Sequence, residues 1–275
     1  MIEYLAPQGS AEWKQARAGC VTASMFAVAR SRVGGLTDQQ ATYVNAIRGG
    51  ASEAEARTQA GYKAAPRSET LARAIAGHPV GDFSDAAKNY AFRLAVERIS
   101  GEPLDEGFET WAMRRGHELE PEARMAHEDA TGDMVRAVGF VTTDDGKFGC
   151  SADGFRLNNS IGCEYKCFVS PEKLRSILLD NDLSDVADQI QGGLWLTGAA
   201  TWELGLYCPA LASISRAFTL RVVPRDEAYI EALEADLVEF ERLVCAYEAR
   251  LRLGDTKAAP AATTPAAEVP ADIFG

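Results

Sequence analysis

The sequence predicts an α/β fold in which helices flank a mixed central sheet, with a small helical insert. Apolar residues recur with helical periodicity over 84–99 and about 108–130. From 134 to 223 the pattern changes to short segments rich in Val, Phe, Ile and Thr that end at Gly, Asp or Asn, which is typical of strands and hairpins. A final helical pattern covers 226 to about 253, so helices precede and follow the strands along the chain.

The N-terminal region, residues 10–29, is expected to form two short helices. Ser10 is a good N-cap for the first helix, because its hydroxyl can accept a hydrogen bond from a backbone N–H of the first turn. Gly19 is expected to end that helix, and Thr22 or Ser24 to cap the next one.

Within the strand-like region one helix is expected at about 184–197. The predicted strands lie at 134–142, 147–156, 161–168, 201–208 and 217–223. The last helix carries an apolar seam in steps of three and four, formed by Ile230, Leu233, Leu237, Phe240, Val244, Tyr247 and Leu251. We expect this seam to pack against the protein's own sheet, with a coiled coil as the alternative.

Composition shifts at two places and suggests a division of the chain. Between residues 36 and 77, Gly49-Gly50 and Gly61 separate three short helical patterns. We therefore expect a core made of 1–33 and 79–254, interrupted by a helical insert at 34–78. After Gly254 an Ala/Pro/Thr-rich stretch, 255–275, cannot bury enough apolar surface to offset its ordering entropy and is expected to be disordered.

The overall composition limits the class of protein. The chain has 275 residues and is 47% hydrophobic, which is enough for a sizeable core. It has no run of 18 apolar residues and no signal-like start, so we expect no membrane span and a cytoplasmic location with six reduced cysteines. A net charge of −12 argues against a surface that attracts phosphate everywhere, so any contact with nucleic acid must be local.

The most informative motif is GCSADGFRLNNSIGCEYKC, residues 149–167. Asp153 is at a tight turn after one predicted strand, and Glu164 and Lys166 are on the next strand. Because side chains alternate along a strand, Glu164 and Lys166 share one face while Tyr165 points away. A hairpin would bring Asp153 close to Glu164. Two such carboxylates suit Mg²⁺ or Mn²⁺, and a lysine beside them can orient or deprotonate a metal-bound water.

A second acidic segment, RGHELEPEAR at 115–124, gives this motif a context. It places Glu120 on a predicted helix, and Pro121 in the middle of that helix predicts a kink or a helix start. Glu120 can therefore supply another metal ligand. Two metal ions about 3.5 to 4 Å apart can position the nucleophile and stabilise both the transition state and the leaving oxygen of phosphodiester hydrolysis.

With these motifs the sequence resembles the phage lambda exonuclease or YqaJ-like viral recombinase branch of the PD-(D/E)XK nucleases. Four blocks match in the family's order: EWKQARAGCVTAS (12–24), GHELEPEAR (116–124), CSADGF with GCEYKC (150–167) and DQIQGGLWLTG (188–198). The resemblance implies a restriction-endonuclease-like fold. It also implies a Mg²⁺-dependent exonuclease that digests double-stranded DNA from 5′-phosphorylated ends, in the 5′-to-3′ direction, and leaves 3′ single strands for recombination.

The resemblance also implies roles for individual residues. Metal ions, two per site, would be held by Glu120, Asp153, Glu164 and the backbone carbonyl of Tyr165, and Lys166 would position the attacking water. A 5′-phosphate pocket would use Arg17, Ser24, Ser151 and Gln191. The chain departs from the family at Ala152, where many members have proline, so the turn before Asp153 is expected to be looser.

The insert carries a second resemblance, to the helix-turn-helix of phage terminase small subunits. Its LTDQQATYV and AGY segments match that pattern, with Tyr43 in place of the usual phenylalanine. From Arg30 to Gly77 there are seven basic and four acidic residues, a local balance of +3. We expect Lys63, Arg67 and Arg73 to contact DNA phosphates, with packing or oligomerisation as the alternative role of the insert.

Family analogy also suggests partners. A homotrimeric ring would thread the duplex, and a single-strand annealing or single-strand-binding protein would dock on the closing VPADIFG. Two other functions stay open at this point: a structure-specific or restriction-type endonuclease, and a non-catalytic DNA-binding or packaging accessory protein.

Overall fold

The computed structural model describes residues 1–77, 80–104, 111–157, 159–167 and 170–253, and for 112 and 113 it describes the backbone alone. The predicted tail, 255–275, and its VPADIFG peptide lie outside these residues. No helix in the described part of the chain is long and apolar enough to cross a membrane.

Two four-stranded mixed sheets form the centre of the fold. The first has the order β1 (Ile2–Tyr4), β5 (Phe140–Thr142), β6 (Phe148–Cys150), β2 (Val21–Thr22). The second has the order β10 (Phe218–Pro224), β9 (Thr201–Tyr207), β8 (Ile161–Cys167), β7 (Gly154–Arg156). β2 and β6 are parallel, as are β8 and β9, whereas the other neighbours within these two sheets are antiparallel.

Two predicted strands were too long. Segment 147–156 is not one strand, because Cys150 pairs with Val141 in the first sheet whereas Gly154 pairs with Cys163 in the second. The chain crosses between the sheets over Ser151–Asp153. Of the predicted strand 134–142 only Phe140–Thr142 is regular, and its beginning makes an isolated bridge from Arg136 to Phe155. Strand β1 and helix α8 (Pro171–Leu178) were not predicted.

The helices follow the predicted patterns closely. The N-terminal pair consists of α1 (Ala11–Arg17), capped by Ser10, and α2 (Phe26–Ala29), which follows the 3₁₀ turn η1 (Ala23–Met25). The long elements are α6 (Asp85–Ser100), α7 (Trp111–Thr131), α9 (Ser184–Thr197) and α10 (Glu227–Leu253). Contrary to the alternative of a helix start at Pro121, α7 begins ten residues earlier and continues through the proline.

The apolar seam of α10 packs inside the protein, but mainly against helices α6, α9 and α2 rather than, as predicted, against a sheet. Leu233, Leu237 and Phe240 are fully buried, and α10 lies along α6. The Phe240 ring stacks on Tyr90, with centroids 5.5 Å apart. The fully buried Trp202 of β9 is covered by two glycines: a Cβ at Gly162 or Gly193 would lie within 2.4 Å of its ring. The seam from Ile230 to Val244 therefore belongs to the core, whereas Leu251 at its end is exposed.

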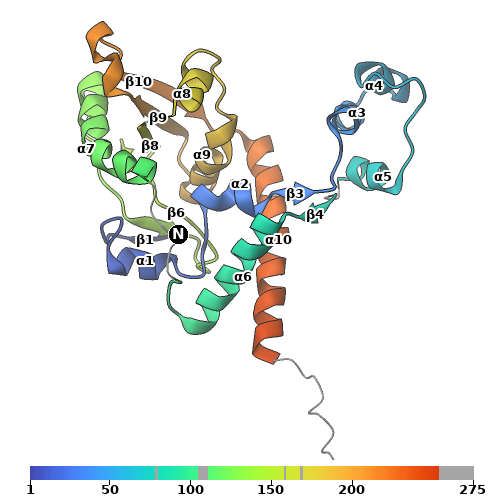
Figure 1. Ribbon diagram of the computed structural model, residues 1–275, viewed down its shortest axis with the longest axis horizontal. Coiled ribbons are helices and arrows are strands. Elements are labelled where there is room, and N and C mark those ends of the chain that lie inside the picture. Colours follow the sequence, from blue (N-terminus) through green and yellow to red (C-terminus); the bar gives the residue numbers. More distant parts are fainter. Residues whose placement is uncertain (78–79, 105–110, 158, 168–169, 254–275) are drawn as a thin grey trace, which may run out of the picture.

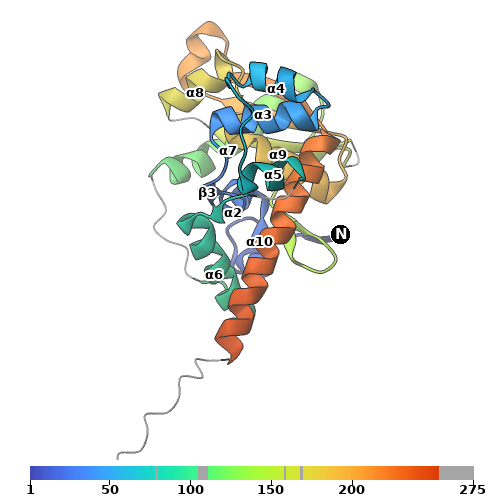
Figure 2. The same ribbon diagram turned by 90° about the vertical axis from the view of Figure 1, so that its right-hand side faces the viewer.

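The insert packs on its own core. A two-stranded antiparallel ribbon, β3 (Arg32–Val33) and β4 (Asp82–Phe83), leads to three helices, α3 (Asp38–Arg48), α4 (Glu53–Gln59) and α5 (Glu69–Ile75). Their buried residues are Tyr43, Val44, Ala56, Ala60, Leu71 and Ala74. Figure 1 shows these helices away from both sheets, at the end of the ribbon, and Figure 2 shows them from the side.

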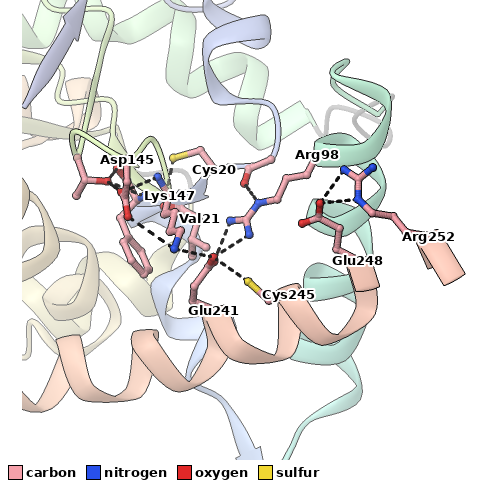
Figure 3. Close-up of polar contacts among 12 residues, drawn as sticks. Cys20, Val21, Arg98, Asp145, Lys147, Glu241, Cys245, Glu248 and Arg252 are labelled. Atoms are coloured by element: carbon pink, nitrogen blue, oxygen red, sulfur yellow. Dashed lines mark hydrogen bonds and ion pairs between the residues drawn. The ribbon is translucent and has the colours of Figure 1, made fainter. Parts of the chain in front are cut away.

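Glu241 of α10 joins several elements in one buried ion-pair cluster (Figure 3). Arg98 of α6 donates to both carboxylate oxygens, at 2.8 and 2.9 Å, and also to the carbonyl of Gly19 at 2.8 Å. Lys147, next to β6, lies 3.8 Å from the same carboxylate. Glu241 thereby holds α6, α10 and the turn that leads from α1 into β2.

Replacing this carboxylate should destabilise the protein strongly. Glu241→Ala leaves the largely buried Arg98 without its partner, and breaking such a pair costs about 3–5 kcal/mol. Chemical denaturation followed by circular dichroism measures the loss. Glu248→Ala is the matched control, because Glu248 pairs with the half-exposed Arg252 one turn away on the same helix, and such a pair contributes about 0.5 kcal/mol or less. Equal losses in the two variants would contradict this account of the cluster.

Candidate active site

Asp153 lies in the connection between the two sheets, where hairpin β7–β8 begins. Its backbone N–H donates to the carbonyl of Cys163 at 3.0 Å, which extends the hairpin by one bond. Its carboxylate oxygen Oδ2 accepts a hydrogen bond from the backbone N–H of Tyr165 at 2.6 Å. The hairpin therefore fixes Asp153 directly beside the strand that carries Glu164 and Lys166.

Glu164 and Lys166 lie on one face of β8, as the alternation predicted. Lys166 Nζ is 2.8 Å from Glu164 Oε1, and only 5% of Glu164 is exposed. Gln189 of α9 completes a triangle: its Nε2 donates to Glu164 at 2.7 Å and its Oε1 accepts from Lys166 at 3.0 Å. Tyr165 points to the opposite face, where it packs with Ala123 of α7.

Glu120 reaches the same area from helix α7. One nitrogen of Arg124, one turn further along α7, donates to Glu120 Oε1 at 3.2 Å and to the backbone carbonyl of Asp153 at 2.9 Å. Arg124 thus ties the helix that carries Glu120 to the turn that carries Asp153. The structure brings Glu120, Asp153, Glu164 and Lys166 into one neighbourhood.

The charges of this cluster act on one another. Burial raises the pKa of Asp153 well above its ordinary value, and the nearby carboxylates of Glu164 and Glu120 raise it further. Burial alone would lower the pKa of Lys166, but the charge and hydrogen bond of Glu164, together with the charge of Asp153, hold that pKa above its usual value. Lys166 is therefore an ammonium group at neutral pH, and the acidic side chains repel one another.

The donor set fits a hard divalent cation, since carboxylate and carbonyl oxygens are the ligands that Mg²⁺ and Mn²⁺ prefer. The oxygens of Glu120, Asp153 and Glu164 do not all lie within 4.8 Å of one another. Ligands about 2.1 Å from Mg²⁺ are at most about 4.2 Å apart. At least one of the three carboxylates must therefore move or bind through a water, as is usual for Mg²⁺.

Another set of metal-ligand types is packed more tightly. In the part of the chain that the structure describes, ligand atoms of His127, Cys163 and Glu203 lie within 4.8 Å of one another. Both ring nitrogens of His127 already have partners, however, and Arg156 lies 2.8 Å from Glu203. Since the cation beside Glu203 is already present, this set is a hydrogen-bonded network and not a metal centre.

Three of the four residues predicted for a phosphate pocket lie near the ends of two parallel strands. Thr22 of β2 pairs with Gly149 of β6, and Ser24 and Ser151 follow these strands. Trp13 Nε1 donates to Ser151 Oγ at 3.1 Å, and the Arg17 guanidinium lies over the Trp13 ring, 4.0 Å from its centroid. Ser24 is exposed. The Trp13 ring thereby links Arg17 to Ser151.

Gln191, the fourth predicted residue, is buried and bonds to backbone groups near the start of α10. Its Nε2 donates to the carbonyl of Pro224 at 3.0 Å, and its Oε1 accepts from the N–H of Asp226 at 3.1 Å. Residues two positions apart on a helix point about 200° apart, so Gln191 faces α10 whereas Gln189 faces Lys166. Gln189 is not among the predicted site residues, although the helical phase counted from the buried Ile190 separates it from Gln191.

The basic residues of the insert lie apart from this cluster. Lys63 and Arg67 are in the loop between α4 and α5, Arg73 is on α5, and all three are exposed. Figure 1 shows α5 well away from β8. The structure therefore does not bring these residues to the candidate active site.

Comparisons with known proteins extend these observations. Residues 12–200 match the sequence profile of the YqaJ-like viral recombinase domain. No curated protein sequence matches the chain. Among solved structures, an alkaline exonuclease (LHK-Exo) from Laribacter hongkongensis is similar, with a TM-score of 0.62 and 22% identity, covering 89% of this chain and 97% of that one.

Two further structures share the fold. LHK-Exo in complex with dAMP also has a TM-score of 0.62, at 23% identity, and covers 89% of this chain and 97% of its own. A phage related exonuclease from Haemophilus somnus 129PT has a TM-score of 0.56 at 14% identity, covering 86% and 96%. The profile spans well over half of the chain, and the structures share its architecture. The chain therefore belongs to the YqaJ-like viral recombinase domain family and has the PD-(D/E)XK fold.

Proposed function

We propose that this protein is a metal-dependent DNA exonuclease. The observation that carries the proposal is the cluster of Asp153, Glu164 and Glu120 with Lys166 at its edge. Membership of a viral recombinase family and a fold shared with proteins described as exonucleases support it. Asp153, Glu164, Glu120 and the Tyr165 carbonyl would hold Mg²⁺, or Mn²⁺ in its place.

The protein's own groups have separable tasks in this proposal. Bound metal ions would activate the nucleophile and neutralise charge on the scissile phosphate. Lys166, kept protonated by Glu164 and held by Gln189, orients the attacking water with its ammonium group. Arg124 holds the backbone of the turn at Asp153.

The polarity of digestion would come from the residues near the ends of β2 and β6. Arg17, Ser24 and Ser151 offer a guanidinium and two hydroxyl groups, which suit a 5′-phosphate. Anchoring a duplex by its 5′ end leads to 5′-to-3′ digestion and a 3′ single strand. Gln191 bonds to backbone at Pro224 and Asp226, and the second N–H of its amide would be its donor to the phosphate.

Removal of the lysine or the aspartate should abolish catalysis. For Lys166→Ala and Asp153→Ala we expect loss of at least about 10³-fold in rate, because positioning and charge stabilisation of this kind account for that order of effect. Release of nucleotides from a 5′-phosphorylated, end-labelled duplex measures it, and EDTA should stop the wild-type reaction. Digestion of covalently closed circles would instead favour an endonuclease, and full activity of either variant would refute the mechanism.

Repulsion within the cluster should be visible in stability without metal. Because the pKa of Asp153 is raised in the folded state, ionising this carboxyl costs folding free energy as pH rises from about 4 through the folded-state pKa, at about 1.4 kcal/mol per pKa unit. Asp153→Asn should therefore raise the melting temperature at pH 7 in EDTA. The gain should vanish below about pH 3.5, where both states bind the proton. With saturating Mg²⁺ only the wild type should be stabilised.

We also propose that the insert contacts duplex DNA through Lys63, Arg67 and Arg73. The supporting observation is that these three side chains are exposed around α5 on a separately packed unit. Since the overall charge is −12, such local positive groups are where phosphate contact is expected.

The salt dependence of binding tests this contact. Replacing Lys63, Arg67 and Arg73 by alanine should flatten the slope of log K on log salt by about 0.9 for each phosphate that the variant no longer neutralises. Replacing the exposed Arg242, Arg250 and Arg252 of α10 is the control, because it removes the same charge elsewhere. An unchanged slope in the insert variant would rule out phosphate contact.

A further inference from the structure

A chain of buried hydrogen bonds lies beneath β8, on the side opposite Glu164 and Lys166. His127 of α7 is fully buried, and its two ring nitrogens have different partners. Nδ1 is 2.9 Å from the Tyr165 hydroxyl, and Nε2 is 2.9 Å from Glu203 of β9. Arg156 of β7 donates to the same Glu203 oxygen at 2.8 Å and to Asp133 at 2.5 Å. The chain thus runs from Tyr165 of β8 through His127 of α7 and Glu203 of β9 to Arg156 of β7.

The chemistry of the partners sets the direction of each bond. Glu203, paired with Arg156, is an acceptor, so His127 Nε2 carries the hydrogen. His127 Nδ1 then accepts, and the Tyr165 hydroxyl is the donor. Burial lowers the pKa of His127, although Glu203 opposes this, and a neutral imidazole fits the arrangement. Both ring nitrogens, the Tyr165 hydroxyl and the Glu203 carboxylate therefore have a hydrogen-bond partner.

His127 also contacts a third strand. Its ring stacks on Phe218 of β10, with centroids 5.7 Å apart and planes at 28°. The apolar cluster between α7 and the sheet consists of Ala123, Val135, Cys163 and Tyr165, with Cys167 and Tyr207 partly buried against it. The hydrogen bonds and ring contact of His127 add to this cluster and join α7 to three strands of the sheet.

The placement of His127 links this chain to the candidate metal ligands. His127 follows Glu120 by seven residues, so the two lie on the same side of α7, about 10 Å apart along its axis. Tyr165, its hydrogen-bond partner, donates its backbone N–H to Asp153. His127 thus lies on the helix that carries Glu120, and it bonds to Tyr165, the residue whose N–H holds Asp153.

We propose that His127 is a positioning residue for the metal site, which it serves by fixing α7 and the Tyr165 segment of β8 relative to each other. This inference rests on the proposed function. It predicts that disturbing His127 weakens metal binding although no atom of its side chain is a ligand. Outer partners of metal ligands typically account for 10- to 100-fold in metal affinity or activity.

Mn²⁺ binding to the whole protein, measured by isothermal titration calorimetry and by electron paramagnetic resonance, tests the proposal without relying on activity. We expect His127→Ala to weaken Mn²⁺ binding about tenfold. Tyr165→Phe keeps the packed ring and removes one hydroxyl donor, so its loss should be smaller, about threefold, in the same direction. Glu241→Ala is the matched control, because it breaks a buried ion pair remote from β8 and should lower stability without changing Mn²⁺ affinity.

The outcomes separate this inference from the proposed function. Failure of the wild type to bind Mn²⁺ would overturn the metal site and this inference with it. Wild-type binding together with unchanged affinity in folded His127→Ala would overturn the inference alone. If His127→Ala does not fold, Tyr165→Phe decides: unchanged affinity refutes the role and a threefold loss supports it. Equal weakening by Glu241→Ala would show that lost stability alone explains the effect.

Discussion

The candidate site depends on one hydrogen bond, from the backbone N–H of Tyr165 to the side-chain carboxylate of Asp153. Burial raises the pKa of Asp153, and repulsion by the Glu164 and Glu120 carboxylates raises it further, so a rigid framework must hold these side chains together. Hairpin β7–β8 does this with main-chain bonds, which no surface substitution removes. Helices α7 and α9 then add Arg124 and Gln189, whose side chains bond to the same small region. Backbone hydrogen bonds of the hairpin therefore fix the position of the site, and the longer side chains of Arg124 and Gln189 add to that framework.

The parts of the site that could be predicted from sequence are those set by neighbouring residues, whereas contacts between distant residues could not be predicted. Period-two alternation is local, so the shared face of Glu164 and Lys166 and the approach of Asp153 were predictable. Strand propensity says nothing about which neighbour a residue pairs with, so the break at Ser151–Asp153 was not. The two glutamines of α9 lie in one matched block, and only the helical phase against the packed core distinguishes Gln189 from Gln191. The His127 network joins residues up to 76 positions apart, and nothing local marks it.

The insert shows why the fold accepts some forty additional residues. The chain leaves the core through β3 and returns through the neighbouring strand β4. The two ends of the insert are therefore close together, and closing it costs little more chain entropy than a short connection would. The base of the ribbon is anchored: Arg30 bonds to Asp188 and Asp236, and Arg32 bonds to Glu239 and lies over the Phe83 ring. Because the insert has a core of its own, changes in its surface need not disturb the two sheets.

The chain and its proposed substrate, DNA, are both negatively charged, so local positive charge is needed for binding. A net charge of −12 opposes adsorption along a duplex, so binding energy has to come from a few places where the local charge is reversed. In the proposed function there are three such places: metal ions at the acidic cluster, Arg17 near the ends of β2 and β6, and the exposed cations of the insert. Since only the first two lie on the nuclease core, a DNA end that satisfies both is favoured over the interior of a duplex. In the proposed function an acidic surface would thereby contribute to selectivity for ends, because it removes the nonspecific contacts that would otherwise compete with them.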